Sequence, residues 1–256
     1  MRRIGLAALT CLELAPPELV SLAVATGYDF VGLRLIPVAA QVLPPFEMRE
    51  LERRLADTGM KVLDVEVFRL DPESNVPAYE PMLATAQRLG ATEILVHGAD
   101  TEEARLVENF GRLCDVAARY RLNANLEPMP WVEVSTVAKA KRVLRAAGRK
   151  NAAHLPDPIH FYRADNRLAE LKEVPNRYLQ FCDARKERPT ETAELIRQAR
   201  GDRLFPGEGG LDLRGLLAAL PDDLPMSLEI PHAGGLAPRE RATRALQATR
   251  KLLETI

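Results

Sequence analysis

Short apolar runs alternate with longer amphipathic segments along the whole chain, and this alternation restricts the fold more than any other feature of the sequence. Strands that alternate with helices are typical of parallel βα units, in which each helix returns the chain to the same end of a sheet. Eight such pairs can be counted. The expected strands cover residues 3–9, 29–35, 61–68, 92–97, 121–127, 152–157, 177–183 and 225–231.

Four of the helical segments between these runs are followed by a glycine. Gly27 follows a helical pattern and stands directly before the next apolar run. Gly59, Gly90 and Gly148 hold the equivalent place after three further helical segments. Glycine is the usual residue just past a helix C-terminus, because it adopts the left-handed conformation without strain. A last helix is expected over residues 238–255.

The length of the chain fits one closed unit of this kind. A (β/α)₈ barrel typically takes about 250 residues, and the chain has 256. An open, doubly wound sheet is the alternative, but no GxGxxG motif follows the first strand. We therefore expect an α/β fold, a (β/α)₈ TIM barrel, formed by residues 1–256 as a single domain. Residues 68–77 form a long loop after the third strand, and residues 201–211 form a Gly-rich insertion before a short helix that precedes the eighth strand. Such barrels build their sites on long loops at the C-termini of strands.

Composition argues against nucleic acid and membranes as binding partners. The chain has 35 basic and 36 acidic residues, so its formal net charge of −1 attracts neither nucleic acid nor an anionic membrane. No uninterrupted apolar stretch approaches the roughly 18 residues that a membrane helix needs, and the apolar start is cut short by Glu13. Cys11, Cys114 and Cys182 show no ligand-like spacing. We expect a cytoplasmic protein whose partner is a small molecule.

Polar side chains stand at the ends of the last four expected strands. Glu127, Asp157 and Glu229 contribute carboxyl groups, and Gln180 contributes an amide. In a barrel the C-termini of all strands face one bowl, so these side chains are expected to meet. Carboxylates in a small space repel one another unless a cation is bound, and oxygen ligands suit Mg²⁺, Mn²⁺ or Co²⁺. The residues therefore predict a divalent metal site.

Short motifs in the same half of the chain carry a resemblance to a known family. In order, they are LEPM around Glu127, DPIH at 157–160, QFCDA at 180–184, PGEG at 206–209 and LEIP around Glu229. Together they resemble the xylose isomerase-like TIM-barrel superfamily, the sugar phosphate isomerase/epimerase family. The resemblance covers almost the whole chain, and it depends on the order of the motifs rather than on any one of them.

The resemblance implies a role for each of these residues. Glu127, Asp157, Gln180 and Glu229 would hold one divalent ion, with Gln180 at the place where the family carries histidine. The ion would be Mn²⁺, Mg²⁺ or Co²⁺, with Zn²⁺ as a further candidate. It would bind a substrate carbonyl and a neighbouring hydroxyl, while Glu127 and Glu229 remove and return a proton. His160 matches the family's substrate-binding histidine.

Charged residues outside this set are further candidates for substrate binding. Arg163 lies close enough to His160 to join it. Arg34 and Glu66 lie within otherwise apolar strands, where a charge is costly unless it faces a polar pocket. A salt bridge between barrel strands is the alternative for each of them. His97 ends the fourth expected strand and is the last candidate.

Several functions stay open at this point. The first is a metal-dependent isomerase or epimerase of a small sugar, sugar phosphate or hydroxy-keto acid, acting through an enediolate. A dehydratase of the same superfamily, similar to inosose or 3-dehydroshikimate dehydratases, would use the same ion and base. A non-catalytic sugar-binding barrel is kept open by Gln180. A barrel related to apurinic-site endonucleases is disfavoured by the four histidines and the slightly negative charge. Barrels of this family often pair, so a homodimer is a further expectation.

Overall fold

Eight parallel strands form one curled sheet in the computed structural model of the chain, which describes residues 2–37, 42–232 and 234–255. The order of the strands across the sheet is β6-β5-β4-β3-β2-β1-β8-β7, so neighbours in sequence are neighbours in space. The strands are β1 (Ile4–Leu6), β2 (Phe30–Arg34), β3 (Lys61–Leu70), β4 (Glu93–Gly98), β5 (Asn123–Glu127), β6 (Ala152–His154), β7 (Leu179–Phe181) and β8 (Met226–Leu228).

Backbone hydrogen bonds join the two edge strands and close the sheet. The amide of His154 at the end of β6 donates to the carbonyl of Pro175 at 2.8 Å, and the amide of Gln180 in β7 donates to the carbonyl of Pro156 at 3.0 Å. The His154 ring also bonds the Asn176 side chain, with 2.8 Å between Nδ1 and Oδ1. A sheet with its edges joined exposes no open ladder. The expected TIM barrel is confirmed.

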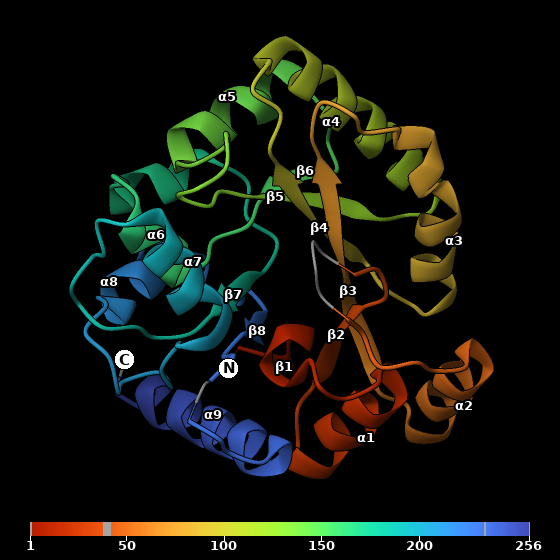
Figure 1. Cartoon of the computed structure of the whole chain (residues 1–256), viewed down its shortest axis with the longest axis vertical. Helices are drawn as coiled ribbons and strands as arrows, with labels where there is room; N and C mark the ends of the chain where they lie inside the picture. Colours follow the sequence, from red (N-terminus) through yellow and green to blue (C-terminus); the bar gives the residue numbers. More distant parts are fainter. Residues whose placement is uncertain (1, 38–41, 233, 256) are drawn as a thin grey trace.

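Helices surround the strands as an outer ring (Figure 1). The α-helices are α1 (Pro16–Thr26), α2 (Met48–Thr58), α3 (Glu80–Arg88), α4 (Glu103–Arg119), α5 (Val137–Ala147), α6 (Pro158–Arg163), α7 (Thr192–Gly201), α8 (Leu213–Ala218) and α9 (Pro238–Leu253). Short 3₁₀ helices are η1 (Ala8–Cys11), η2 (Val76–Tyr79) and η3 (Leu168–Glu173). Gly27 and Gly148 cap α1 and α5 with φ of 82° and 62°, as the sequence predicts. None of the helices in the described ranges is long and apolar enough to cross a membrane.

Most strands are shorter than the apolar runs that predict them. β1 ends at Leu6 and gives way to η1, and β6 ends at His154, three residues before the expected end. Pro156 has no amide hydrogen to add to a ladder, which limits β6. Asp157 and Glu229 therefore follow their strands on short irregular extensions, whereas Glu127 and Gln180 lie within β5 and β7. Only β3 is longer than expected and runs on to Leu70 inside the anticipated loop.

An apolar plug fills the inside of the barrel below these extensions. It consists of Phe30, Leu63, Val67, Leu95, Leu155 and Tyr178, all buried. A Cβ atom on Gly5 would lie only 1.9 Å from the Phe30 ring, so the ring packs against bare backbone there. Packed side chains of this kind leave no channel through a barrel. The polar residues of the site lie next to this plug, toward the C-terminal ends of the strands.

Candidate functional site

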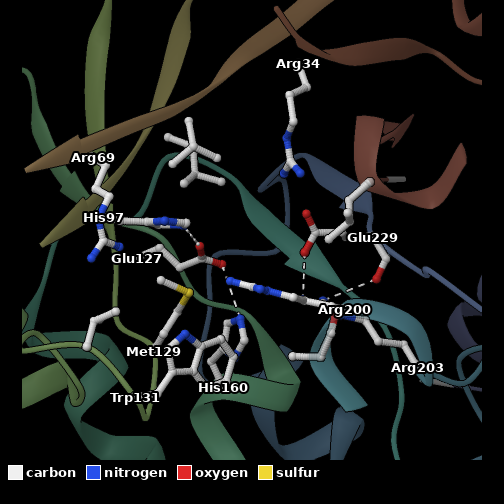
Figure 2. Close-up of a pocket in the computed structure, with 15 residues that line it drawn as sticks. Arg34, Arg69, His97, Glu127, Met129, Trp131, His160, Arg200, Arg203 and Glu229 are labelled. Atoms are coloured by element: carbon white, nitrogen blue, oxygen red, sulfur yellow. Dashed lines mark hydrogen bonds and ion pairs between the residues drawn. The ribbon is translucent and has the colours of Figure 1, made fainter. Parts of the chain in front are cut away.

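A cavity of about 400 Å³ opens above the plug, at the C-terminal ends of the strands (Figure 2). Met129 and Trp131 form part of an apolar side of this cavity. Its polar and charged side chains come from β2 to β5, from the segment after β8, and from α6, α7 and the segment after α7. They are Arg34, Arg69, His97, Glu127, His160, Arg200, Arg203 and Glu229. The sequence predicts five of these as site residues.

Glu127, the last residue of β5, has two oxygens in different surroundings. Oε2 lies 2.9 Å from Nε2 of His97 on the neighbouring strand. Oε1 is buried, accepts no hydrogen bond from the described residues, and lies 3.9 Å from Nε2 of His160. Burial, and next the negative charge of Asp157, raise the pKa of the Glu127 carboxyl well above its ordinary value. One oxygen is therefore fixed and the other is free to exchange a proton with a ligand.

Asp157 and His160 belong to the start of α6. The Asp157 Oδ1 atom caps the helix by accepting a hydrogen bond from the Ile159 amide at 3.0 Å, which fixes the carboxylate. Its Oδ2 atom lies 3.7 Å from His160 Nε2. Burial alone would raise the pKa of Asp157, but the charge and hydrogen bond of Arg203, with other contacts, hold it below its ordinary value. Burial lowers the pKa of His160 to about 3, so its imidazole is neutral at physiological pH.

Glu229 follows β8 and faces the same cavity from the other side (Figure 2). Its Oε2 atom pairs with Arg203 at 2.8 Å, and its Oε1 atom accepts a hydrogen bond from Gln180 Nε2 at 3.0 Å. Burial raises the pKa of the Glu229 carboxyl well above its ordinary value, although Arg203 acts in the opposite direction. The cavity thus has two buried carboxyl groups, Glu127 and Glu229, that favour protonation more than an exposed glutamate does.

Arg203 is the main site residue that the sequence analysis misses. Its side chain is 2% exposed and bridges two of the predicted metal ligands. Nη1 lies 2.8 Å from Asp157 Oδ2, and Nη2 lies 2.8 Å from Glu229 Oε2. The residue lies in the 201–211 loop, three positions before the PGEG motif begins at Pro206. The next residue, Leu204, pairs with Asp183 in the segment after β7. The acidic cluster was a clue to such a residue, because buried carboxylates need a cation and an arginine of the chain can supply one.

Arg34 and Glu66 form the inter-strand salt bridge that was the alternative to a role in substrate binding. Their side chains form a salt bridge between β2 and β3, with 2.9 Å from Nη2 to Oε1. Arg34 also lines the cavity, whereas Glu66 is fully buried beneath it. Gln180 links this pair to the ligand cluster, because its Nε2 atom lies 3.5 Å from Glu66 Oε2. The two opposite charges neutralise each other beside the ligand cluster.

Arg163 does not join His160, and this expectation is corrected. Its buried guanidinium donates hydrogen bonds to the backbone carbonyls of Arg185 at 2.6 Å and Lys186 at 3.3 Å. The side chain leaves α6 toward the loop after β7 instead of entering the cavity, so it ties the helix to that loop. Spacing along a helix places two residues on adjoining faces but does not fix where a long side chain ends.

The PGEG motif supports the site without contributing to it. Asp183 accepts hydrogen bonds from the amides of Gly207 at 3.0 Å, Gly209 at 3.0 Å and Leu211 at 3.2 Å. Glu208 points to the surface, where it pairs with Arg244 at 3.4 Å. The motif is therefore a turn held by one buried carboxylate, and it fixes the segment that carries Arg203.

The donor atoms around the cavity fit a divalent metal ion. One ligand atom each from Glu127, Asp157 and His160 lies within 4.8 Å of the others. Two buried oxygens, Glu127 Oε1 and Gln180 Oε1, accept no hydrogen bond from the described residues. Carboxylate and amide oxygens together with imidazole suit Mn²⁺, Mg²⁺ or Zn²⁺. His160 thus becomes a candidate ligand beside the four that the sequence predicts.

Comparison with known proteins agrees with this geometry. The sequence model of the family described as "Xylose isomerase-like TIM barrel" matches residues 20–252. The chain belongs to this family. The resemblance drawn from the strand-end motifs is confirmed, and the matched region contains every site residue described above.

Relatives of the chain carry the names of different reactions. A 3-dehydroshikimate dehydratase of Pseudomonas aeruginosa is 29% identical over 80% of this chain, which spans only 34% of that protein. An inosose isomerase of Bacillus velezensis is 24% identical over 76% of this chain and 74% of its own length. Among solved structures, the IolI protein with a bound zinc atom has a TM-score of 0.82 at 20% identity, covering 99% of this chain and 98% of its own. A D-allulose 3-epimerase of Methylomonas sp. has a TM-score of 0.72 at 18% identity, over 98% and 97% of the two chains.

Proposed function

We propose that the chain is a divalent-metal-dependent enzyme that enolises a small hydroxy-keto compound, with isomerisation or epimerisation as the overall reaction. The observation that supports this most is the pair of buried carboxyl groups, Glu127 and Glu229, on the walls of one cavity. Burial raises the pKa of both carboxyl groups. General acid–base catalysis is most efficient when the pKa of the catalytic group lies near the working pH.

Each residue has a task in this proposal. Glu127 takes the proton from the carbon beside the carbonyl, while His97 holds its Oε2 atom at 2.9 Å. Glu229 returns a proton from the other flank. His160, with a neutral ring, hydrogen-bonds a substrate hydroxyl. A divalent ion held by Glu127, Asp157, Gln180 and Glu229 would supply the Lewis acidity that stabilises the enediolate.

The charges around the cavity favour an anionic substrate over a neutral sugar. Arg69 and Arg200 line its exposed side, and Arg34 lines its wall. Arg69 is partly neutralised by Asp71 at 3.3 Å, whereas Arg200 forms no ion pair with any described residue. A guanidinium at the mouth of a cavity binds carboxylate or phosphate oxygens through paired hydrogen bonds. A hydroxy-keto acid is therefore the substrate class we propose first.

Dehydration is the second candidate, and one local feature favours it. Two imidazoles flank Glu127, and burial lowers the pKa of His97 and His160 to about 3 each. A neutral imidazole can donate a hydrogen bond to a departing hydroxyl group. The 29% identity to a 3-dehydroshikimate dehydratase also points to this outcome, because loss of a β-hydroxyl begins with the same proton abstraction.

The test is exchange of substrate hydrogen with solvent. The purified chain, loaded with Mn²⁺, is incubated in D₂O with a panel of ketoses, sugar phosphates and cyclic or linear hydroxy-keto acids. We expect deuterium to enter one class of these compounds at the carbon beside the carbonyl. Proton NMR measures this as loss of the signal of that C–H group. A new ultraviolet band of an α,β-unsaturated product would select dehydration over isomerisation. No exchange and no product with any compound, by folded and metal-loaded protein, contradicts the proposal.

A further inference from the structure

The ladder between β1 and β8 stops directly before Glu229. The last residues in register are Leu6 and Leu228, after which β1 gives way to η1. The amide of Ala7 still donates to the carbonyl of Leu228 at 3.1 Å. Beyond this bond, β1 no longer runs beside the segment that carries Glu229 and Ile230. The backbone of this segment needs another partner there, because a buried amide is costly to leave unpaired.

The carbonyl group that would continue this ladder is already in use. The amide of Met226 donates to the carbonyl of Arg3 at 3.0 Å. The bonds of a parallel ladder are evenly spaced, so each step of two residues along one strand matches a step of two residues along the other. By this count the amide of Ile230 would donate to the carbonyl of Ala7. That carbonyl instead accepts the amide of Thr10 at 3.2 Å, in the first turn of η1.

The side chain of Thr10 takes the place of the missing carbonyl. Its Oγ1 atom accepts a hydrogen bond from the amide of Ile230 at 2.8 Å and donates one to the carbonyl of Leu228 at 2.7 Å. All three residues are fully buried, so solvent does not compete for either bond. One hydroxyl group therefore holds the backbone on both sides of Glu229.

The other edge of this segment is fixed by β7. The amide of Glu229 donates to the carbonyl of Phe181 at 3.1 Å. The contacts of Thr10 and Phe181 together fix the backbone of Glu229 between η1 and β7. Its carboxyl group faces the cavity, and Oε1 lies 3.0 Å from Nε2 of Gln180 (Figure 2). Any shift of the backbone would carry this carboxyl group with it.

We propose that Thr10 is a positioning residue, which holds Glu229 on the flank of the cavity from which it returns a proton. The inference rests on the proposed function, in which Glu127 removes the proton and Glu229 returns it. Thr10 is fully buried and does not line the cavity, so it acts through the backbone of Glu229. Loss of its hydroxyl group leaves proton removal by Glu127 intact and slows proton return from the other flank.

The ratio of two rates in D₂O tests this inference. Mn²⁺-loaded wild type, Thr10→Val and Thr10→Ser are incubated with the compound that the wild type enolises, and NMR follows both deuterium entry into the substrate and formation of product. Valine keeps the shape of threonine but cannot accept the Ile230 amide. We expect Thr10→Val to form product about tenfold more slowly, because misplacing a reacting group by about 1 Å can cost on the order of 10²-fold. Exchange into the substrate should fall much less, so the ratio of exchange to product rises, and Thr10→Ser should restore it.

Thr249→Val is the matched control and should keep the wild-type ratio. Thr249 is equally buried, but its hydroxyl group donates to the carbonyl of Ala245 at 2.8 Å within α9. If Thr10→Val does not fold, Thr10→Cys replaces it and should raise the ratio by a smaller factor, since a thiol is a weak donor and acceptor. A wild-type ratio in the folded variant, or an equal loss of exchange and product, overturns the inference alone. If folded, Mn²⁺-loaded wild type exchanges no compound, the proposed function fails and the inference fails with it.

Discussion

The Nε2 atom of His97 lies 2.9 Å from Oε2 of Glu127, and the two residues face each other in register across β4 and β5. Burial, followed by the positive charge of Arg34, lowers the pKa of His97 to about 3. The ring is therefore neutral near pH 7 and acts as a hydrogen-bonding partner, not as a counter-ion. A partner of this kind orients a carboxylate without neutralising it. Glu127 keeps its other oxygen available for chemistry.

Glu127→Gln should abolish proton exchange while preserving the fold. Glutamine has the same shape and can still bond His97, but its amide cannot accept a proton from carbon. Loss of a general base typically lowers rates about 10²–10⁴-fold. We expect a drop of this size in deuterium incorporation measured by NMR in D₂O. Glu208→Gln, at the exposed pair with Arg244, should exchange at the wild-type rate; retained exchange in Glu127→Gln would exclude Glu127 as the base.

Arg200→Met should weaken substrate binding more than it slows turnover. Arg200 lines the exposed side of the cavity and pairs with no described acid, so its charge is available to a ligand. An exposed ion pair contributes about 1 kcal/mol at most, which corresponds to a rise of about fivefold in KM. The rise should shrink in high salt, because exposed charges are screened.

Two comparisons control the Arg200 experiment. Arg112→Met removes an exposed guanidinium that pairs with Glu108 at 2.5 Å, outside the cavity, and should leave KM unchanged. A neutral ketose that the protein enolises should respond less to Arg200→Met than an acid does. An equal response of neutral and acidic substrates would argue against recognition of an anion by Arg200.

The fold and part of the site follow from local patterns in the sequence. Alternating segments and glycine caps such as Gly27 predict the barrel, because strand and helix periods are local properties. Glu127 and Glu229 can be placed in the cavity for a topological reason, since parallel strands end at one face. Arg203 could not be placed in this way. Its guanidinium reaches the ligand cluster from a loop, and the pairing of that loop with the segments after β7 and β8 brings it there.

The error at Arg163 has a related cause. The distance of three residues from His160 is a property of the helix, but the direction of a long side chain depends on which acceptors lie around it. Backbone carbonyls after β7 offered those acceptors. Sequence reasoning therefore locates short acidic side chains at strand ends more accurately than long basic ones, whose ends can lie several ångströms from the backbone that carries them.

Gly209→Ala should destabilise the loop that carries Arg203. A Cβ atom at this position would lie 2.3 Å from both the Ala184 carbonyl oxygen and Oδ1 of Asp183. Neither atom can move without breaking the turn, and overpacking of this kind costs about 1–3 kcal/mol. Gly201→Ala is the matched control, because its Cβ would meet nothing within 4 Å at the end of α7. Urea denaturation should show a lower free energy of unfolding for Gly209→Ala than for Gly201→Ala. Equal values would mean that the loop accommodates the added methyl group without loss of stability.

Acidification should weaken the barrel at the seam between β6 and β7, through His154. Burial lowers the pKa of His154 to about 4, with its hydrogen bond to Asn176 acting in the opposite direction. In the unfolded chain a histidine has a pKa of about 6.5. Between these two values the unfolded state binds a proton that the folded state does not, so stability falls as the pH drops from about 6.5 toward 4. Above pH 7 the group has no effect on stability.

The size of this effect can be isolated with one variant. From pH 7 to pH 5 the His154 contribution should cost the wild type about 2 kcal/mol of unfolding free energy. His154→Gln keeps a side-chain donor for Asn176 but does not titrate. Between pH 7 and pH 5 the unfolding free energy of this variant should therefore fall by about 2 kcal/mol less than that of the wild type. Urea denaturation of both proteins at the two pH values measures the difference. A parallel decline of the two proteins would mean that His154 is protonated as readily in the folded chain as in the unfolded one, and that the seam admits water.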